Sequence, residues 1–218
     1  MNRELFALRF KVYCLECGFL DPKAYEDKLE TDEFDSNSVH FTAHNLEKEL
    51  VGSVRLVLPG LDQSFPFQAH CPQLFDDAFM PPPTESGEVS RLVVRESYRR
   101  RVGDTRAGVS KEFLIGSSFN LEEERPAWER RSSSPQILLG LYREMYQYSI
   151  EANVRYWYAA MEKSLARALS RLQFVFKPIG METNYYGPVT PYVADLRELE
   201  ERLGANNPDL LGWFRAGL

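Results

Sequence analysis

The order of apolar and polar positions along this chain predicts a mixture of strands and helices. Apolar residues recur at helical spacing over residues 4–16, and Gly18 follows them, so we expect an amphipathic helix that ends there. Further helices are expected over 136–152, over 162–172 and in the tail. Runs rich in β-branched and aromatic residues predict strands over 39–45, 49–58, 87–96, 154–161 and 174–181, and an extended segment over 185–196.

The strand over 87–96 stands out because its apolar run is unbroken. Leu92, Val93 and Val94 follow one another, which is typical of a strand buried on both faces.

Residues 59–87 are rich in Pro, Gly and Gln and are predicted to be mostly loop, and residues 116–135 form a polar insertion. The sequence shows no repeat or linker, so one α/β or α+β domain over residues 1–218 is expected.

The composition is that of a soluble globular protein and narrows the functional classes. Of 218 residues, 44% are hydrophobic and 27% are charged, and the net charge of −6 argues against broad nucleic-acid binding. No apolar run approaches the ~20 residues that a membrane span needs, and the N-terminus lacks the features of a signal peptide. Three cysteines favour a reducing compartment, so a cytoplasmic location is expected.

The cysteines and histidines imitate a zinc-binding pattern. Cys14 and Cys17 are separated by two residues, and His40 and His44 by three. The cysteines fall inside the predicted helix, however, and nothing between the two pairs resembles a zinc finger. No metal ion is therefore expected.

The stretch ETDEFD, residues 30–35, places four acids in six positions directly before a predicted strand. It fits a solvated loop. It also fits a site that holds a cation, either an arginine of the same chain or the amine of a substrate.

A second charged stretch, LVVRESYRRRVGD, carries the buried strand into a basic turn that contains a glycine. Backbone N–H groups at such a turn suit a phosphate, and Arg99, Arg100 and Arg101 would add charge-assisted hydrogen bonds. A solvated basic turn is the alternative. The stretch resembles the acyl-donor loop (Q/R)xxGx(G/A) of the GNAT acyltransferases, with Arg100 and Gly103 retained and Thr105 departing from the pattern.

Motifs spread over more of the chain resemble the acyl-homoserine-lactone synthases, a GNAT-like family. In chain order they are Arg9, Tyr13, Phe19, the tetrapeptide Asp32-Glu33-Phe34-Asp35, Arg55, Glu88, Ser90 and Arg91. Tyr13 and Phe19 stand where that family has Phe and Trp. The segments LRFKVYCLECGF, AAMEKSLARALSRL and GPVTPYVADL resemble more closely a sister group, the acyltransferases associated with the PEP-CTERM/exosortase system, which resemble N-acyl amino acid synthases.

This resemblance runs from about residue 8 to residue 197 and implies a GNAT-like fold. Its central mixed sheet would be splayed at the middle and flanked by helices. Val93, Val94, Arg99 to Arg101 and Gly103 would bind the acyl donor. Because the first motif lies so near residue 1, a short N-terminal segment is expected to be missing.

The resemblance also implies attack of an amine on an acyl thioester, without a bound cofactor. Glu88 would serve as general base through a water molecule, with Ser90 and Arg91 beside it. Backbone N–H groups of the same strand are candidates for stabilising the carbonyl oxygen. The alternative for Glu88 is a strand-end carboxylate paired with Arg91 or Arg55.

The acids of the 30–35 stretch acquire a role from the same resemblance. A charged lattice beside the active site would consist of Arg9, Asp32, Asp35, Arg55 and Arg91, with Tyr13 and Phe19 nearby. In it, the aspartates would anchor the arginines and fix the loop over the substrate amine.

The donor is expected to be an acyl carrier protein ahead of coenzyme A. Lys163, Arg167 and Arg171 fall on one helical face of an otherwise acidic protein, and carrier proteins are strongly acidic. A solvated helix face is the alternative.

The function expected from these observations is transfer of a fatty acyl group to the amine of an amino acid or a similar small molecule. A homoserine-lactone synthase that uses S-adenosylmethionine is the rival within the enzymes. A non-catalytic module that binds an acyl ligand or a carrier protein is the rival from another class.

Overall fold

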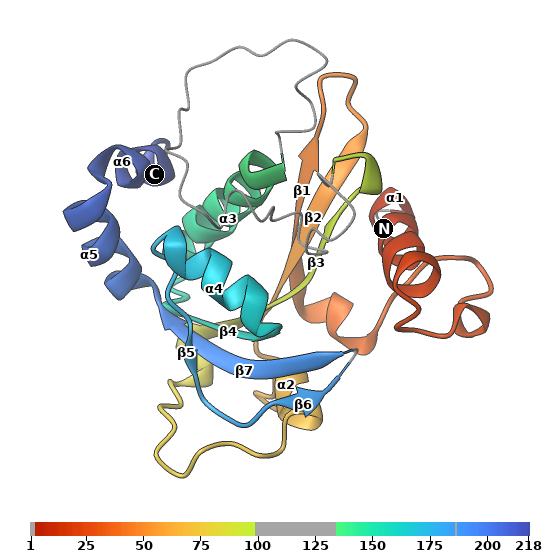
Figure 1. Cartoon of the computed structure of the whole chain (residues 1–218), viewed down its shortest axis with the longest axis horizontal. Coiled ribbons are helices and arrows are strands. Elements are labelled where there is room, and N and C mark those ends of the chain that lie inside the picture. The colour runs from red at the N-terminus through yellow and green to blue at the C-terminus, as the bar shows by residue number, and fades with distance from the viewer. Residues whose placement is uncertain (1–2, 99–133, 186) are drawn as a thin grey trace. The chain divides into compact units, whose positions relative to one another are not determined.

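The computed structural model describes residues 3–98, 134–185 and 187–218, and strands and helices follow one another along them (Figure 1). The strands are β1 Ser38–His44, β2 Leu50–Val57, β3 Ser86–Val94, β4 Tyr156–Met161, β5 Lys177–Pro178, β6 Thr183–Asn184 and β7 Pro188–Asp195. The α-helices are α1 Arg3–Phe10, α2 Pro66–His70, α3 Ser134–Glu151, α4 Lys163–Arg171, α5 Leu196–Asn206 and α6 Pro208–Arg215. Short 3-10 helices are η2 Pro22–Ala24, η3 Glu33–Asn37, η4 Pro83–Glu85 and η5 Glu96–Tyr98, and η1 Lys11–Glu16 is a π-helix.

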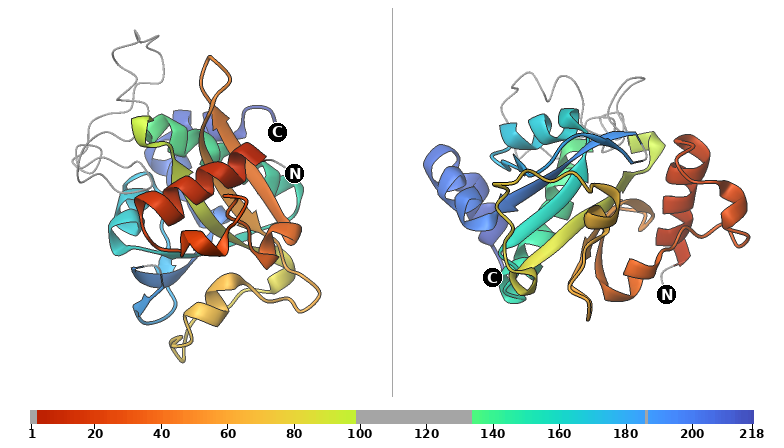
Figure 2. Two further views of the ribbon diagram at one scale, coloured as in Figure 1. Left: turned by 90° about the vertical axis from the view of Figure 1, so that its right-hand side faces the viewer. Right: turned by 90° about the horizontal axis from the view of Figure 1, so that it is seen from below.

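Within the described residues the strands form one mixed sheet. Its order is β1-β2-β3-β4-β7-β5, and β6 pairs with β7. β3 and β4 are parallel, whereas β7 runs antiparallel to β4, β5 and β6. Figure 2 shows β4 and β7 side by side. The predicted mixed α/β class is confirmed.

The chain divides into two compact units, and each is interrupted in sequence. The first unit comprises Met1–Glu30, Thr42–Val54 and Arg91–Tyr142. The second comprises Thr31–Phe41, Arg55–Ser90 and Arg143–Leu218. The expectation of a single domain stays a prediction.

Each unit has its own apolar cluster. The cluster of the first unit contains Leu5, Phe6, Leu8, Val12, Leu29, Leu50 and Val93. The cluster of the second contains Phe65, Phe67, Cys71, Tyr156, Tyr158, Ile179, Val189 and Val193. Burial of this apolar surface is the main stabilising contribution in each unit.

The parallel pairing of β3 with β4 covers only the start of both strands. The register runs from Ser86↔Tyr156 to Glu88↔Tyr158, while β4 continues to Met161 alongside β7. Farther along β3, Arg91 has a φ of +50°, which is uncommon for a residue with a Cβ atom and interrupts the regular strand backbone. Glu88 therefore lies where the pairing of β3 with β4 ends.

Three elements differ from the sequence-based expectation. The expected helix over 4–16 is α-helical only to Phe10 and then widens into a π-helix, in which the Cys17 N–H bonds the Val12 carbonyl; Gly18, with φ +61°, follows it. The expected loop over 59–87 contains α2. Of the expected strand over 174–181, only Lys177–Pro178 is a strand.

Candidate active site

Glu88 is a buried acid on β3, with only 3% of its surface exposed. Its carboxylate accepts a hydrogen bond of 2.8 Å from the backbone N–H of Phe67, in the first turn of α2. Gly87 precedes it, and a Cβ atom there would lie 2.8 Å from Cδ1 of Leu56, so the strand approaches β2 closely at this position. The carboxylate is thus held by the backbone of two elements.

The titratable neighbours of Glu88 retain their protons at neutral pH. Burial, and secondarily the charge of Glu88, raise the pKa of Cys71 to about 11. Burial raises the pKa of Tyr158, the register partner of Glu88, to about 12. Because a neutral thiol is a poor nucleophile, this arrangement offers no activated cysteine.

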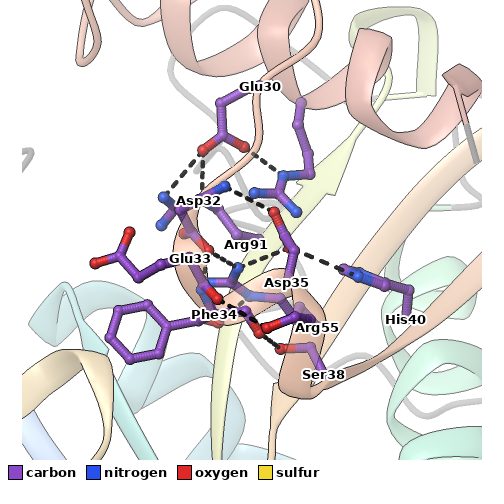
Figure 3. Close-up of polar contacts among 12 residues, drawn as sticks. Glu30, Asp32, Glu33, Phe34, Asp35, Ser38, His40, Arg55 and Arg91 are labelled. Carbon is purple, nitrogen blue, oxygen red and sulfur yellow. Dashed lines mark hydrogen bonds and ion pairs between the residues drawn. The ribbon is translucent and has the colours of Figure 1, made fainter. Parts of the chain in front are cut away.

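Arg55 is the centre of a charged cluster in the second unit, and its side chain is 1% exposed. Its Nη1 donates to Asp32 Oδ1 at 2.5 Å and to Asp35 Oδ1 at 2.8 Å. Its Nε donates to the Ser90 Oγ at 3.0 Å. Figure 3 shows both aspartates turned toward Arg55. Since alternate residues of a strand share a face, Glu88 lies on the same face of β3 as Ser90.

The two aspartates also fold the loop that carries them. Asp32 accepts the N–H of Phe34 at 3.0 Å, and Asp35 accepts the N–H of Asp32 at 2.8 Å, which together make a capping box on η3. His40 Nε2 lies 3.6 Å from Asp35 Oδ1 (Figure 3). The acid-rich stretch is therefore an ordered turn that is bonded to an arginine.

A second charged cluster belongs to the first unit and centres on Glu30. Arg9 Nε donates to one oxygen of Glu30, and both of these side chains are fully buried. Arg91 donates to the other oxygen from Nε at 3.1 Å and from Nη2 at 3.0 Å (Figure 3). Two guanidinium groups thus share one carboxylate.

Tyr13 adds an aromatic wall to this second cluster. Its ring lies 5.4 Å from the Arg91 guanidinium carbon and 6.1 Å from the ring of Phe19. Its hydroxyl donates to the Leu92 carbonyl at 3.4 Å, and burial raises its pKa. Tyr13 lies in the π-helical segment.

The structure distributes the five residues of the expected lattice over these two clusters. Arg55 pairs with Asp32 and Asp35, whereas Arg9 and Arg91 pair with Glu30. The expected lattice omitted Glu30. The charge balance could have revealed this omission, because two aspartates cannot neutralise three arginines.

The residues assigned to the acyl donor are described only in part. Val93 and Val94 are fully buried in β3. Arg99, Arg100, Arg101, Gly103 and the part of the expected insertion up to residue 133 lie outside the described residues.

Lys163, Arg167 and Arg171 belong to α4. Lys163 Nζ pairs with Glu182 at 3.0 Å, and Arg167 Nε donates to the Lys163 carbonyl at 3.2 Å. All three residues are exposed. Spacing of i, i+4 and i+8 puts the three side chains on one helical face, as expected.

Neither a metal-binding cluster nor a membrane-spanning helix is found in the described part of the chain. Over residues 3–98, 134–185 and 187–218, no group of three or more His, Cys, Asp or Glu side chains is arranged to hold a metal ion. No helix in the same ranges has the length and apolar character required to cross a bilayer.

Comparison with known proteins shows which families and solved structures this architecture resembles. Residues 8–107 match the model of the acetyltransferase (GNAT) domain. No curated protein matches the chain.

Solved structures match nearly the whole chain at low sequence identity. BjaI, a CoA-dependent acyl-homoserine lactone synthase solved with SAM and isopentyl-CoA, is 18% identical with a TM-score of 0.60, over 97% of this chain and 90% of that one. TofI, solved in a ternary complex with an inhibitor and MTA, is 16% identical with a TM-score of 0.58, over 95% and 91%. FeeM, an N-acyl amino acid synthase from uncultured soil microbes, is 12% identical with a TM-score of 0.51, over 91% and 88%.

The expected GNAT-like fold is confirmed by these matches. Residues 8–107 match the acetyltransferase (GNAT) domain model, and the chain has the fold of an acyl-homoserine lactone synthase and of an N-acyl amino acid synthase, which supports an acyltransferase.

Proposed function

We propose that this enzyme transfers a fatty acyl group from an acyl thioester to the amine of an amino acid or a similar small molecule. The observation that carries the proposal is the environment of Glu88. A buried carboxylate is fixed by the Phe67 N–H at the residue where β3 and β4 stop pairing, and its titratable neighbours Cys71 and Tyr158 are protonated. Such a carboxylate suits a general base.

The reaction proceeds by direct attack. Glu88, through a bound water molecule, takes a proton from the ammonium group of the acceptor and leaves a neutral amine. The amine nitrogen then forms a bond to the thioester carbonyl carbon, and the carbon–sulfur bond breaks. The departing thiolate takes up the second proton that the nitrogen loses and leaves as a thiol. The chain's own groups act on the proton and the developing oxyanion, for which backbone N–H groups of β3 beyond Glu88 are the candidate donors.

The acceptor is drawn by the charge of the Arg55 cluster. Asp32 and Asp35 place two carboxylates beside Arg55. Carboxylates near the site favour a cationic acceptor over a neutral one. On this proposal the cluster keeps the turn at residues 32–35 in place while the ammonium group approaches the face of Glu88 and Ser90.

The donor is an acyl carrier protein that docks on the basic face of α4. The exposed side chains of Lys163, Arg167 and Arg171 support this choice, since an acidic partner is attracted to a row of cations. Coenzyme A is the second donor candidate, and in either case Arg99 to Arg101 and Gly103 would bind the donor's phosphates.

The resemblance of three segments to the PEP-CTERM/exosortase group supports a proposal about where the enzyme works and which cellular system it serves. The enzyme would work in the cytoplasm and serve that system. The segment GPVTPYVADL, whose main part forms β7, carries this assignment.

The test is mass spectrometry of lipids from a bacterial host that expresses the wild-type chain, Glu88→Gln or Glu144→Gln. Glu144 is an exposed acid of α3 and serves as the matched control. A long-chain N-acyl amino acid is expected with the wild type and the control and is expected to fade with Glu88→Gln. Soluble wild-type protein without any new acylated species would contradict the proposal.

A homoserine-lactone synthase is the second candidate. It is favoured by Arg9, Asp32, Asp35 and Arg55, the residues that resemble that family and that the structure places in charged pairs. A lactone among the extracted products, dependent on S-adenosylmethionine, would establish it in place of the amino acid acceptor.

A further inference from the structure

A cavity of about 380 Å³ lies in the second unit, away from Glu88. It is formed where β3 and β4 begin, at the end of α3 and at the first turn of α5. It is lined by Glu85, Ser149, Ile150, Asn153, Val154, Arg155, Leu196, Arg197 and Glu200. Glu85 precedes Glu88 by three residues, which is about 10 Å along a strand. The volume of the cavity is within the range of ligand pockets in proteins, about 300–1,000 Å³.

Two arginines, Arg155 and Arg197, and two acids, Glu85 and Glu200, line this cavity. Arg155 and Arg197 both donate to Asp195 Oδ2, at 3.2 and 3.4 Å. Glu200, in contrast, is already bonded to Arg215 at 2.8 Å. Two guanidinium groups therefore compete for one carboxylate, as Arg9 and Arg91 do around Glu30.

Arg155 also has a donor without an acceptor. Its Nε is buried and has no hydrogen-bond partner in the part of the chain that the structure describes. A buried donor left unpaired costs about 1–3 kcal/mol, so such a group next to a cavity signals an acceptor that comes from outside the chain. The start of α5, at Leu196 and Arg197, adds the positive end of a helix dipole.

One part of the cavity wall is apolar. Ile150, Val154 and Leu196 supply aliphatic side chains, and Ile150 remains 41% exposed. An aliphatic wall beside a cationic end fits an amphiphilic ligand, with the apolar part against the three side chains and the anionic part on the arginines.

We propose that this cavity is a second ligand site, separate from the acyl-transfer site, and that it binds a carboxylate with an aliphatic body. The carboxylate accepts from Arg155 Nε and from the guanidinium of Arg197. The site does not depend on the proposed function, since none of its residues takes part in the reaction at Glu88.

Isothermal titration calorimetry with octanoate, leucine and octan-1-ol tests this site. Octanoate and leucine share the carboxylate and an aliphatic body, and octan-1-ol lacks the carboxylate. Binding of either carboxylate, with at least tenfold weaker binding of octan-1-ol, is expected. Tighter binding of octanoate would identify the ligand as a fatty acid, and tighter binding of leucine would identify it as an amino acid.

Three variants make the test specific. Arg155→Lys keeps the charge but removes the Nε donor, and Arg202→Lys is its control, because Arg202 pairs with Glu198 outside the cavity. Ile150→Glu adds a negative charge at an exposed position of the cavity. Arg155→Lys and Ile150→Glu should weaken carboxylate binding at least tenfold, and Arg202→Lys should not change it. The site is overturned if the wild type binds neither carboxylate at millimolar concentration, or if all four proteins bind equally.

Discussion

The backbone N–H of Phe67 donates a 2.8 Å hydrogen bond to the carboxylate of Glu88, although 21 residues separate them in the chain. The bond joins a five-residue helix to a central strand. It fixes the orientation of the acid and at the same time satisfies a donor in the first turn of α2, where no helical carbonyl is within reach.

Replacing Glu88 with alanine should therefore destabilise the protein as well as inactivate it. Glu88→Ala leaves the Phe67 N–H unpaired and is expected to lower the free energy of unfolding by about 1–3 kcal/mol. Glu88→Gln retains an acceptor oxygen and should cost less than about 1 kcal/mol. Urea unfolding of the three proteins measures both values, and equal stability of the two variants would show that this hydrogen bond does not contribute.

Removing the charge of Glu30 should be the more damaging change. Glu30→Gln removes the negative charge that the guanidinium groups of Arg9 and Arg91 share, for an expected loss of about 3–5 kcal/mol. The control is Glu16→Gln, which removes a partly exposed pair with Lys11 and should change stability by about 0.5 kcal/mol or less. Similar losses in the two variants would contradict the special role of the buried cluster.

Alkaline pH should weaken the fold through Cys71. Its pKa is raised to about 11 in the folded protein, above the ordinary value of 9.0 in the unfolded chain. The stability that the neutral thiol contributes is fully present below pH 9 and is lost as the pH rises through 11. Free energies of unfolding at pH 8, 9.5 and 10.5 should therefore fall less steeply for Cys71→Ala than for the wild type; parallel curves would refute this linkage.

Substitution of Gly87 should reveal how tightly β3 and β2 approach beside Glu88. An added Cβ atom would meet Leu56 Cδ1 at 2.8 Å and the Val57 carbonyl oxygen at 3.3 Å, so Gly87→Ala is expected to cost about 1–3 kcal/mol. At Gly140, within α3, a Cβ atom meets nothing within 4 Å. Gly140→Ala should instead stabilise the helix by about 0.5–1 kcal/mol. Thermal unfolding compares the two, and a stabilised Gly87→Ala protein would show that β2 yields at this position.

Features that depend on local sequence could be predicted, and those that depend on distant partners could not. The run Leu92, Val93 and Val94 was enough to place β3, because burial on both faces leaves an unbroken apolar pattern. α2 was missed because five residues are too few to show a period, and its Phe67 N–H bonds to an acid that the chain reaches only 21 residues later.

The same distinction holds for the candidate site. The motifs predicted one charged lattice of five residues, and only its part made of Arg55, Asp32 and Asp35 forms direct contacts as one group. In the other cluster, Arg91 pairs with Glu30 from a position of positive φ, and Tyr13 packs on Arg91 from the π-helical segment. Neither backbone feature leaves a periodic signal in the sequence.

The triad Arg9, Glu30 and Arg91 also bears on the order of events during synthesis. Arg9 meets Glu30 across 21 residues, but Glu30 is joined by Arg91 only after another 61. Closing the longer loop costs entropy that nearby contacts cannot offset in advance. The first helix emerges early from the ribosome and yet cannot complete its buried charge cluster until β3 has been translated. Premature termination before residue 91 would therefore release a chain with an incomplete charge cluster, a substrate for quality-control proteases.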